Sequence, residues 1–184
     1  LNIAEAGKGP LVLLLHGFPE SWYSWRHQFA PLAAAGYHVV APDMRGYGKS
    51  DKPEAIDAYN QVEVVNDIIG LIRALGYEQA VVIGHDWGAP TAWATALFHP
   101  DKVRAVGGLS VPFMPRSPVQ PMPMLRMLFK GQFFYQLYFQ EPGVAEAEFE
   151  KDIKGGLRKF LVMAGGETDL TKLPPKTEHD DLLS

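Results

Sequence analysis

The sequence predicts an α/β protein whose mostly parallel sheet is covered by helices on both faces. Short apolar runs typical of buried strands alternate with segments in which apolar residues recur every three or four positions, as on one face of a helix. The predicted strands cover residues 1–6, 11–15, 37–41, 80–83 and 103–109. Strands and helices in alternation are typical of a parallel sheet that is buried on both sides.

Turn residues set the limits of these elements. Residues 7–10, Gly-Lys-Gly-Pro, separate the first two strands, which fits either a hairpin or a step between adjacent strands. Ser21 is an N-cap residue, and the apolar side chains after it share a helical face up to Gly36. These side chains are Trp22, Trp25, Phe29 and Leu32. A second helix carries Val62, Val65, Ile69 and Ile72 and ends at Gly76.

Composition excludes several classes of protein. A chain of 184 residues that is 47% apolar can bury a substantial core. Its net charge of −4 gives no electrostatic reason to bind nucleic acid or an anionic membrane. Cysteine is absent, and the six histidines show no metal-ligand spacing, so we expect no metal. No apolar run is long enough to span a bilayer and no secretory signal opens the chain, so we expect a cytoplasmic protein.

Residues 80–98 carry the strongest chemical signal. The predicted strand Ala80-Val-Val-Ile83 runs into Gly84-His85-Asp86-Trp87-Gly88 and then into an alanine-rich helix. Glycines two positions either side of Asp86 suit a sharp strand-to-helix turn whose central residue is strained. An aspartate is already an anion at neutral pH, because its reference pKa is about 3.9. Such an anion attacks saturated carbon that bears a leaving group, which favours epoxides or alkyl halides over esters as substrates.

The loop at residues 42–50 ends in Gly46-x-Gly48-Lys49-Ser50, which superficially resembles a phosphate-binding loop. The required spacing places a glycine at position 43, where this chain has Asp43, so nucleotide binding is excluded. We expect Asp43 and Arg45 to satisfy backbone groups and one another.

The histidines have mainly structural interpretations. We expect His16 to shape the loop after the second strand through hydrogen bonds. We expect His85, on a tight turn beside Asp86, to be structural, and His99 to interact with a helix C-terminus. The other three have no chemical context in the sequence: His27, His38 and His179.

The character of the chain changes after residue 112. Five prolines fall between positions 112 and 123, which indicates a linker or an extended excursion. An aromatic run at 133–139 follows, and then a charged stretch in which Phe149, Ile153, Leu157 and Phe160 share a helical face that Gly155-Gly156 weakens. We expect residues 173–184 to form a loop. The predicted domains are the N-terminal part of a core, residues 1–112, and a linker with a partial helical cap, residues 113–184.

Four motifs together resemble the epoxide hydrolases of the α/β-hydrolase superfamily. They are His16-Gly-Phe-Pro-Glu-Ser-Trp22, Asp43-x-Arg-Gly-Tyr-Gly-x-Ser50, Gly84-His-Asp-Trp-Gly88 and Tyr135-Gln-Leu-Tyr-Phe-Gln-Glu-Pro-Gly143, with Val144-Ala-Glu-Ala-Glu148 following the last. The resemblance implies a partial α/β-hydrolase core followed by the first part of a helical cap or lid. It also implies that the protein uses no cofactor and that its partners are a small apolar epoxide and water.

The resemblance implies a role for each matching residue. Asp86 would attack an epoxide carbon and form an alkyl-enzyme ester, while Tyr135 would donate a proton to the leaving oxygen, with Tyr138 as the second choice. The backbone N–H groups of Phe18 and Trp87 would form the oxyanion hole for hydrolysis of the ester. The side chains expected to line the apolar substrate pocket are those of Phe18, Trp87, Tyr138 and Phe139.

The sequence departs from the family after the lid. In the hydrolases that it resembles, an acid and then a histidine base follow the nucleophile, and a second lid tyrosine also comes later. None of these motifs follows Asp86 here, so we expect a piece of a longer enzyme, rather than a degenerate protein, that forms the ester and fails to hydrolyse it. Two other functions stay open: a haloalkane or haloacid dehalogenase of the same fold, and a non-catalytic ligand-binding homologue. The oligomeric state is also open, a dimer included.

Overall fold

The computed structural model describes residues 1–164 and 175–183, and the side chains of 163 and 164 are outside that description. These residues form two compact units, Leu1–Met114 and Pro115–Ser184.

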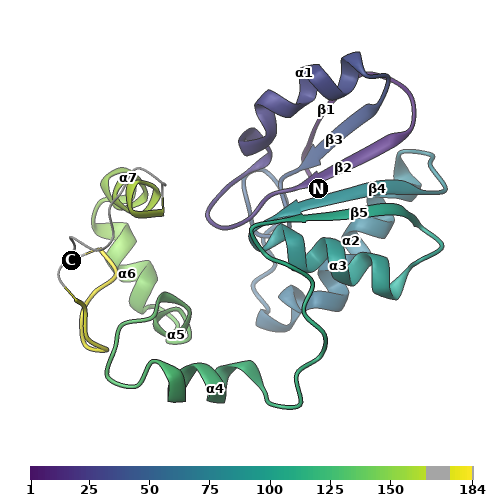
Figure 1. Cartoon of the computed structure of the whole chain (residues 1–184). Helices are drawn as coiled ribbons and strands as arrows, with labels where there is room; N and C mark the ends of the chain where they lie inside the picture. Colours follow the sequence, from purple (N-terminus) through teal and green to yellow (C-terminus); the bar gives the residue numbers. More distant parts are fainter. Residues whose placement is uncertain (165–174, 184) are drawn as a thin grey trace. The chain divides into compact units, whose positions relative to one another are not determined.

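The first unit is built on one five-stranded sheet (Figure 1). Its strands are β1 (Ile3–Ala6), β2 (Leu11–Leu15), β3 (His38–Pro42), β4 (Ala80–His85) and β5 (Val103–Leu109). The spatial order is β1-β3-β2-β4-β5, and every pair of neighbours is parallel except β1 with β3. The predicted mostly parallel α/β sheet is therefore confirmed.

The expected pairing of the first two strands is wrong, because β3 lies between them. β2 is buried along its whole length and has β3 on one edge and β4 on the other. The remaining edge of β3 is free for β1, which pairs with it from Ile3↔Pro42 to Ala6↔Val39. His38 reinforces this edge, since its ring nitrogens lie 3.0 Å from the Glu5 carboxylate and 2.9 Å from the Tyr77 hydroxyl. No context for His38 was visible in the sequence, because Glu5 and Tyr77 are both distant from it along the chain.

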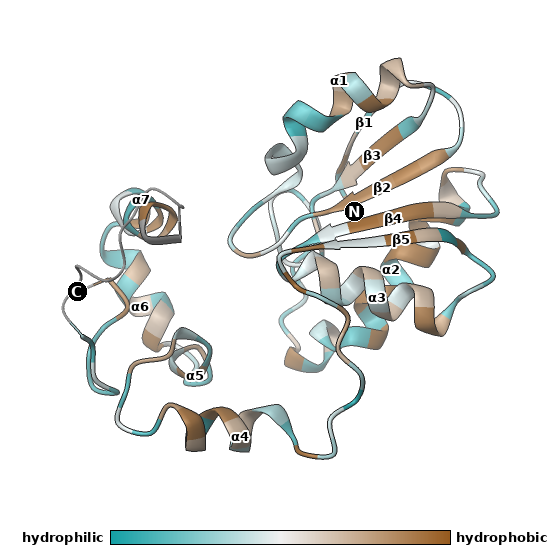
Figure 2. Cartoon of the chain, in the orientation of Figure 1, coloured by the Kyte–Doolittle hydropathy of each residue, from teal (hydrophilic) through white to brown (hydrophobic). Residues whose placement is uncertain are grey.

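Helices cover both faces of the sheet, and alternate strand residues supply the two cores. The helical segments of this unit are η1 (Trp22–Trp25), α1 (Arg26–Ala34), η2 (Ile56–Tyr59), α2 (Gln61–Ala74) and α3 (Gly88–Phe98). On one face, Leu13 and Val40 pack with the buried side of α2, including Ile68. On the other face, Val12 and Leu14 pack with Trp25. Figure 2 shows the hydrophobic strands between these layers.

Two caps start these helices. The Ser21 side chain accepts a hydrogen bond from the Tyr23 N–H, as predicted, although the helix opens with the 3₁₀ turn η1 before α1. The Asn60 side chain caps α2 by accepting from the N–H groups of Val62 and Glu63 at 2.9 and 3.0 Å. This second cap was not predicted from the sequence.

The second unit is helical. Its elements are α4 (Pro121–Leu128), α5 (Tyr135–Tyr138), α6 (Val144–Lys151) and α7 (Ile153–Ala164), and residues 175–183 contain no helix or strand. The predicted loop at 173–184 falls partly outside the described residues. Among the described helices, none is both long and apolar enough to cross a membrane.

The predicted amphipathic stretch around Phe149 is two helices rather than one. The chain breaks at Asp152, whose side chain accepts a hydrogen bond from the Gly155 N–H at 2.9 Å. An aspartate that captures the N–H three residues ahead starts a new helix, so Gly155 falls in the first turn of α7. The rings of Phe149 and Phe160 still meet across the break, with centroids 6.4 Å apart, whereas Ile153 is 60% exposed.

Candidate active site

The turn between β4 and α3 holds Asp86 in a strained conformation. Its φ is +50°, in the left-handed region that residues other than glycine rarely adopt. The flanking glycines are required by space, because a Cβ on Gly84 would overlap the Gly88 carbonyl and a Cβ on Gly88 would overlap the Leu15 carbonyl. The predicted sharp turn is present, and it presents Asp86 at the carboxyl end of strand β4, which pairs with β2 and β5.

The Asp86 carboxylate lies against the loop that follows β2. The Phe18 backbone N–H donates a hydrogen bond to Asp86 Oδ1 at 2.8 Å. A Cβ on Gly17 would lie 2.5 Å from the same oxygen, so only glycine leaves room for the carboxylate there. Trp87 begins the turn into α3, and its side chain is 52% exposed. The structure therefore brings together three of the predicted site residues: Phe18, Asp86 and Trp87.

His16 fixes the position of this loop. One ring nitrogen, Nδ1, lies 2.8 Å from the Gly17 carbonyl oxygen, and the other, Nε2, accepts the Met44 backbone N–H at 2.9 Å. Because Nε2 must accept, the ring is neutral and donates through Nδ1. Burial lowers the pKa of His16, which is 2% exposed, and this agrees with a neutral ring. The prediction that His16 shapes this loop through hydrogen bonds is confirmed.

Glu20 links the loop to the turn that carries Asp86. Its Oε2 accepts the Gly17 N–H at 3.1 Å, and its carboxylate lies 3.4 Å from Nδ1 of His85. The Glu20 carboxylate thus joins the residue before Phe18 to the residue before Asp86.

The expected contact between Asp43 and Arg45 is wrong. Asp43 accepts from backbone N–H groups of Trp22 and Lys49, both at 3.1 Å, and from the Asn2 side chain at 2.8 Å. Burial opposes its ionisation, but these hydrogen bonds outweigh burial and lower the pKa of Asp43. Arg45 points elsewhere and makes a two-pronged ion pair with Asp67, with both N···O distances 2.7 Å. Asp43 is close to Arg45 along the chain, whereas the actual partner, Asp67, lies 22 residues away on α2.

The other predicted site residues lie in the second unit, on or beside α5. The Tyr138 hydroxyl donates a hydrogen bond to Glu148 Oε2 at 2.9 Å. Burial and the Glu148 carboxylate raise the pKa of Tyr138 to about 12. The Tyr135 oxygen instead accepts a hydrogen bond from Gln136 Nε2 at 3.1 Å, and its ring lies 6.0 Å from that of Phe139. The proton of Tyr138 is therefore engaged by Glu148, which favours Tyr135 over Tyr138 as a proton donor.

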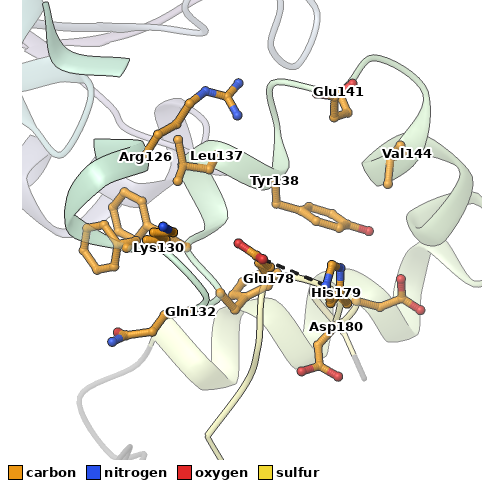
Figure 3. A pocket seen from close by; sticks show the side chains of 14 residues that line it. Arg126, Lys130, Gln132, Leu137, Tyr138, Glu141, Val144, Glu178, His179 and Asp180 are labelled. Atoms are coloured by element: carbon orange, nitrogen blue, oxygen red, sulfur yellow. Dashed lines mark ion pairs between the residues drawn. The ribbon is translucent and has the colours of Figure 1, made fainter. Parts of the chain in front are cut away.

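The second unit also contains a cavity of about 560 Å³ (Figure 3). Tyr138 lines it, together with the basic residues Arg126 and Lys130 and acidic residues that include Glu141 and Glu178. Of the four side chains expected to line the apolar substrate pocket, Tyr138 lines this cavity and Phe18, Trp87 and Phe139 do not. In the described part of the chain, no group of three or more His, Cys, Asp or Glu side chains is arranged to hold a metal ion.

Comparison with known proteins defines the class. Residues 10–151 match the alpha/beta hydrolase fold family, and the chain belongs to that family. It is similar to proteins named epoxide hydrolase: 52% identical to Epoxide hydrolase A of Mycobacterium tuberculosis over 163 residues, covering 88% of this chain and 51% of that protein. It is also 49% identical to Bifunctional epoxide hydrolase 2 of Sus scrofa over 172 residues, covering 93% of this chain and 30% of that protein.

Solved structures agree. Epoxide Hydrolase A from Mycobacterium thermoresistibile matches with a TM-score of 0.89 and 49% identity over 95% of this chain and 56% of that one. An epoxide hydrolase from an endophytic Streptomyces matches with a TM-score of 0.84 and 54% identity over 86% of this chain and 48% of that one. The expected fold and family resemblance are therefore confirmed. The chain spans about half the length, or less, of the curated relatives reported above.

Sequence reasoning missed three residues that hold the site residues in place: Glu20, Gln136 and Glu148. Glu20 stands inside the first quoted motif, so its position was a usable signal. Gln136 likewise stands inside the fourth quoted motif, next to Tyr135. Glu148 ends the stretch that follows the fourth motif, but its partner could not be found from periodicity, because the hydrogen bond to Tyr138 joins two different helices.

Proposed function

We propose that this chain carries the ring-opening machinery of an epoxide hydrolase, with Asp86 as the nucleophile. The observation that carries the proposal is the strained Asp86, whose carboxylate meets the Phe18 N–H at 2.8 Å. Strain at a non-glycine residue persists only where the surroundings enforce it, and such residues cluster at functional sites. The names of the relatives support epoxides as the substrate class. We also propose that residues 1–112 are the hydrolase core and residues 113–184 a linker and partial cap.

In the first step, a carboxylate oxygen of Asp86 attacks one epoxide carbon. The ring C–O bond breaks, its electron pair stays on the oxygen, and Tyr135 gives its phenolic proton to that oxygen. The products are a hydroxyalkyl ester of Asp86 and the Tyr135 phenolate, which takes a proton back from water. Gln136 supports this role, since a donor to the phenol oxygen stabilises the phenolate that forms.

In the second step, water attacks the ester carbonyl and the C–O bond to the enzyme breaks, which releases a diol. The backbone N–H groups of Phe18 and Trp87 would stabilise the oxyanion, at roughly a few kcal/mol for each donor. The attacking water needs a base, and His16 cannot serve because its two ring nitrogens are engaged by Gly17 and Met44. None of the family's histidine motifs follows Asp86 in these 184 residues, so we expect the ester to accumulate on this chain.

Intact-mass spectrometry after brief mixing with styrene oxide tests the proposal. The parent chain should gain the mass of one styrene oxide, and peptide mapping should place it on Asp86. Asp86→Asn should gain none, because the neutral amide is a far weaker nucleophile than the carboxylate. Equal labelling of parent and Asp86→Asn would contradict the nucleophile assignment. Labelling by matched alkyl halides with halide release, and none by epoxides, would favour the dehalogenase alternative.

A further inference from the structure

The turn that carries Tyr135 cannot hold its own shape. α5 is one turn long, Tyr135–Tyr138, and its N-cap residue Phe134 makes no side-chain cap hydrogen bond. Isolated helices this short do not form, because the cost of the first turn exceeds what its few hydrogen bonds return. The position of Tyr135 is therefore set by the contacts that hold α5 from outside.

Glu148 on α6 makes the side-chain hydrogen bond that ties the end of α5 to its surroundings, whereas at the start of α5 the Phe134 ring stacks on Phe129 with centroids 4.0 Å apart. Oε2 of Glu148 accepts hydrogen bonds from the Tyr138 hydroxyl at 2.9 Å and from the Leu182 N–H at 3.1 Å. Its Oε1 accepts the Leu183 N–H at 2.7 Å. Three donors fix the orientation of this half-buried carboxylate, and hydrogen bonds to an ionised acceptor are the stronger kind. Glu148 thus fastens α5 to α6 and to the segment 175–183.

Contacts between aromatic rings connect Tyr138 to Tyr135. The Phe139 ring lies 6.2 Å from the Tyr138 ring and 6.0 Å from the Tyr135 ring, the latter edge to face. On the far side, the Phe133 ring lies 5.5 Å from Tyr138. Figure 3 shows Tyr138 projecting from its turn across the cavity. A shift of the Tyr138 ring would therefore move Phe139 and with it Tyr135.

We infer that Glu148 is a positioning residue for the cap acid Tyr135 and acts through Tyr138. The inference rests on the proposed role of Tyr135 in opening the epoxide. In this arrangement the two tyrosines have different roles. Tyr138 donates its hydrogen bond to Glu148 and anchors the turn, whereas Tyr135 donates its proton to the substrate oxygen. Loss of the anchor should slow the step that needs that proton and leave proton-independent chemistry at Asp86 unchanged.

Two alkylating agents separate these steps on the 184-residue chain. Styrene oxide needs a proton on its leaving oxygen, whereas benzyl bromide loses bromide without one. We expect Tyr138→Phe and Glu148→Leu to slow styrene oxide labelling of Asp86 by about tenfold to a hundredfold, as misplaced catalytic groups do. In Glu148→Leu, labelling of Asp86 by benzyl bromide should change by less than about twofold, since it uses no general acid.

A second readout uses Tyr135→Phe as the background. Glu148→Leu should slow the parent and should not slow Tyr135→Phe any further, because the group being positioned is already missing. Glu148→Gln should fall between the parent and Glu148→Leu, since its amide oxygen can still accept from Tyr138. The matched control is Glu150→Gln, an exposed carboxylate on the same helix, which should label at the parent rate.

The outcomes distinguish the inference from the proposed function. If the parent labels no faster than Asp86→Asn, the proposed function fails. If Asp86 is labelled normally in both Tyr138→Phe and Glu148→Leu, the positioning role is wrong. It is also wrong if Glu148→Leu slows both agents equally, or slows Tyr135→Phe as much as it slows the parent, because either result means that the side chain only keeps the unit folded.

Discussion

Replacement of Gly84 by alanine tests whether close backbone contact, rather than backbone conformation, shapes the turn at Asp86. The φ of Gly84 is not in the positive range that excludes other residues, so alanine could adopt its backbone. The added Cβ would however overlap the Gly88 carbonyl and lie 2.5 Å from the Ala89 nitrogen. Both are backbone atoms, so no side chain can move aside and either β4 or α3 must shift.

We expect Gly84→Ala to lower the free energy of unfolding by about 3 kcal/mol or more, the upper end of the range for overpacking. The midpoint of thermal unfolding should fall by about 10 °C. The control is Gly70→Ala, also a glycine without positive φ. Gly70 is exposed on α2 and its added Cβ would meet no atom within 4 Å. This control should raise stability by roughly 0.5–1 kcal/mol, because alanine is the better helix former.

Tryptophan fluorescence in urea reports the unfolding of the first unit, which contains Gly84. All four tryptophans, Trp22, Trp25, Trp87 and Trp93, belong to the first unit, so the signal follows the unfolding of the sheet. The unfolding midpoint of Gly84→Ala should fall well below that of the parent, with Gly70→Ala slightly above it. A midpoint for Gly84→Ala within error of the parent would refute the argument that Gly84 is required by close packing against α3.

Two further predictions concern the supports of the first unit. Because burial lowers the pKa of His16 below its ordinary 6.5, the unfolded chain binds a proton that the native state refuses as pH falls below 6.5. The contribution of neutral His16 to stability should therefore be lost progressively below about pH 6.5, by up to about 1.4 kcal/mol per pH unit. Between pH 7.5 and pH 5, the urea midpoint should fall more steeply for the parent than for His16→Asn. Equal slopes would show that His16 is not held neutral. Arg45→Lys should lower the free energy of unfolding in urea by about 1–3 kcal/mol, since lysine cannot reproduce the two-pronged ion pair with Asp67. The control Arg73→Lys, at an exposed position of α2, should change it by less than about 0.5 kcal/mol.

The sequence by itself determined the elements and the central turn of this protein. Strand and helix follow from the period of apolar residues, which is a local property, and the paired glycines around Asp86 report a steric need of that same turn. The motif at 16–22 likewise predicted which loop would approach the nucleophile, and the Phe18 N–H lies on Asp86 in the structure.

Only the tertiary structure decided which distant groups meet. The pairing of β1 with β3, of Arg45 with Asp67 and of Tyr138 with Glu148 each joins segments that are separated along the chain. A hydrogen bond depends on distance and direction in space, and periodicity along one segment carries no information about the position of another. The family resemblance ranked Tyr135 ahead of Tyr138 as the proton donor, and the hydrogen bond from Tyr138 to Glu148 supplies a physical reason for that order.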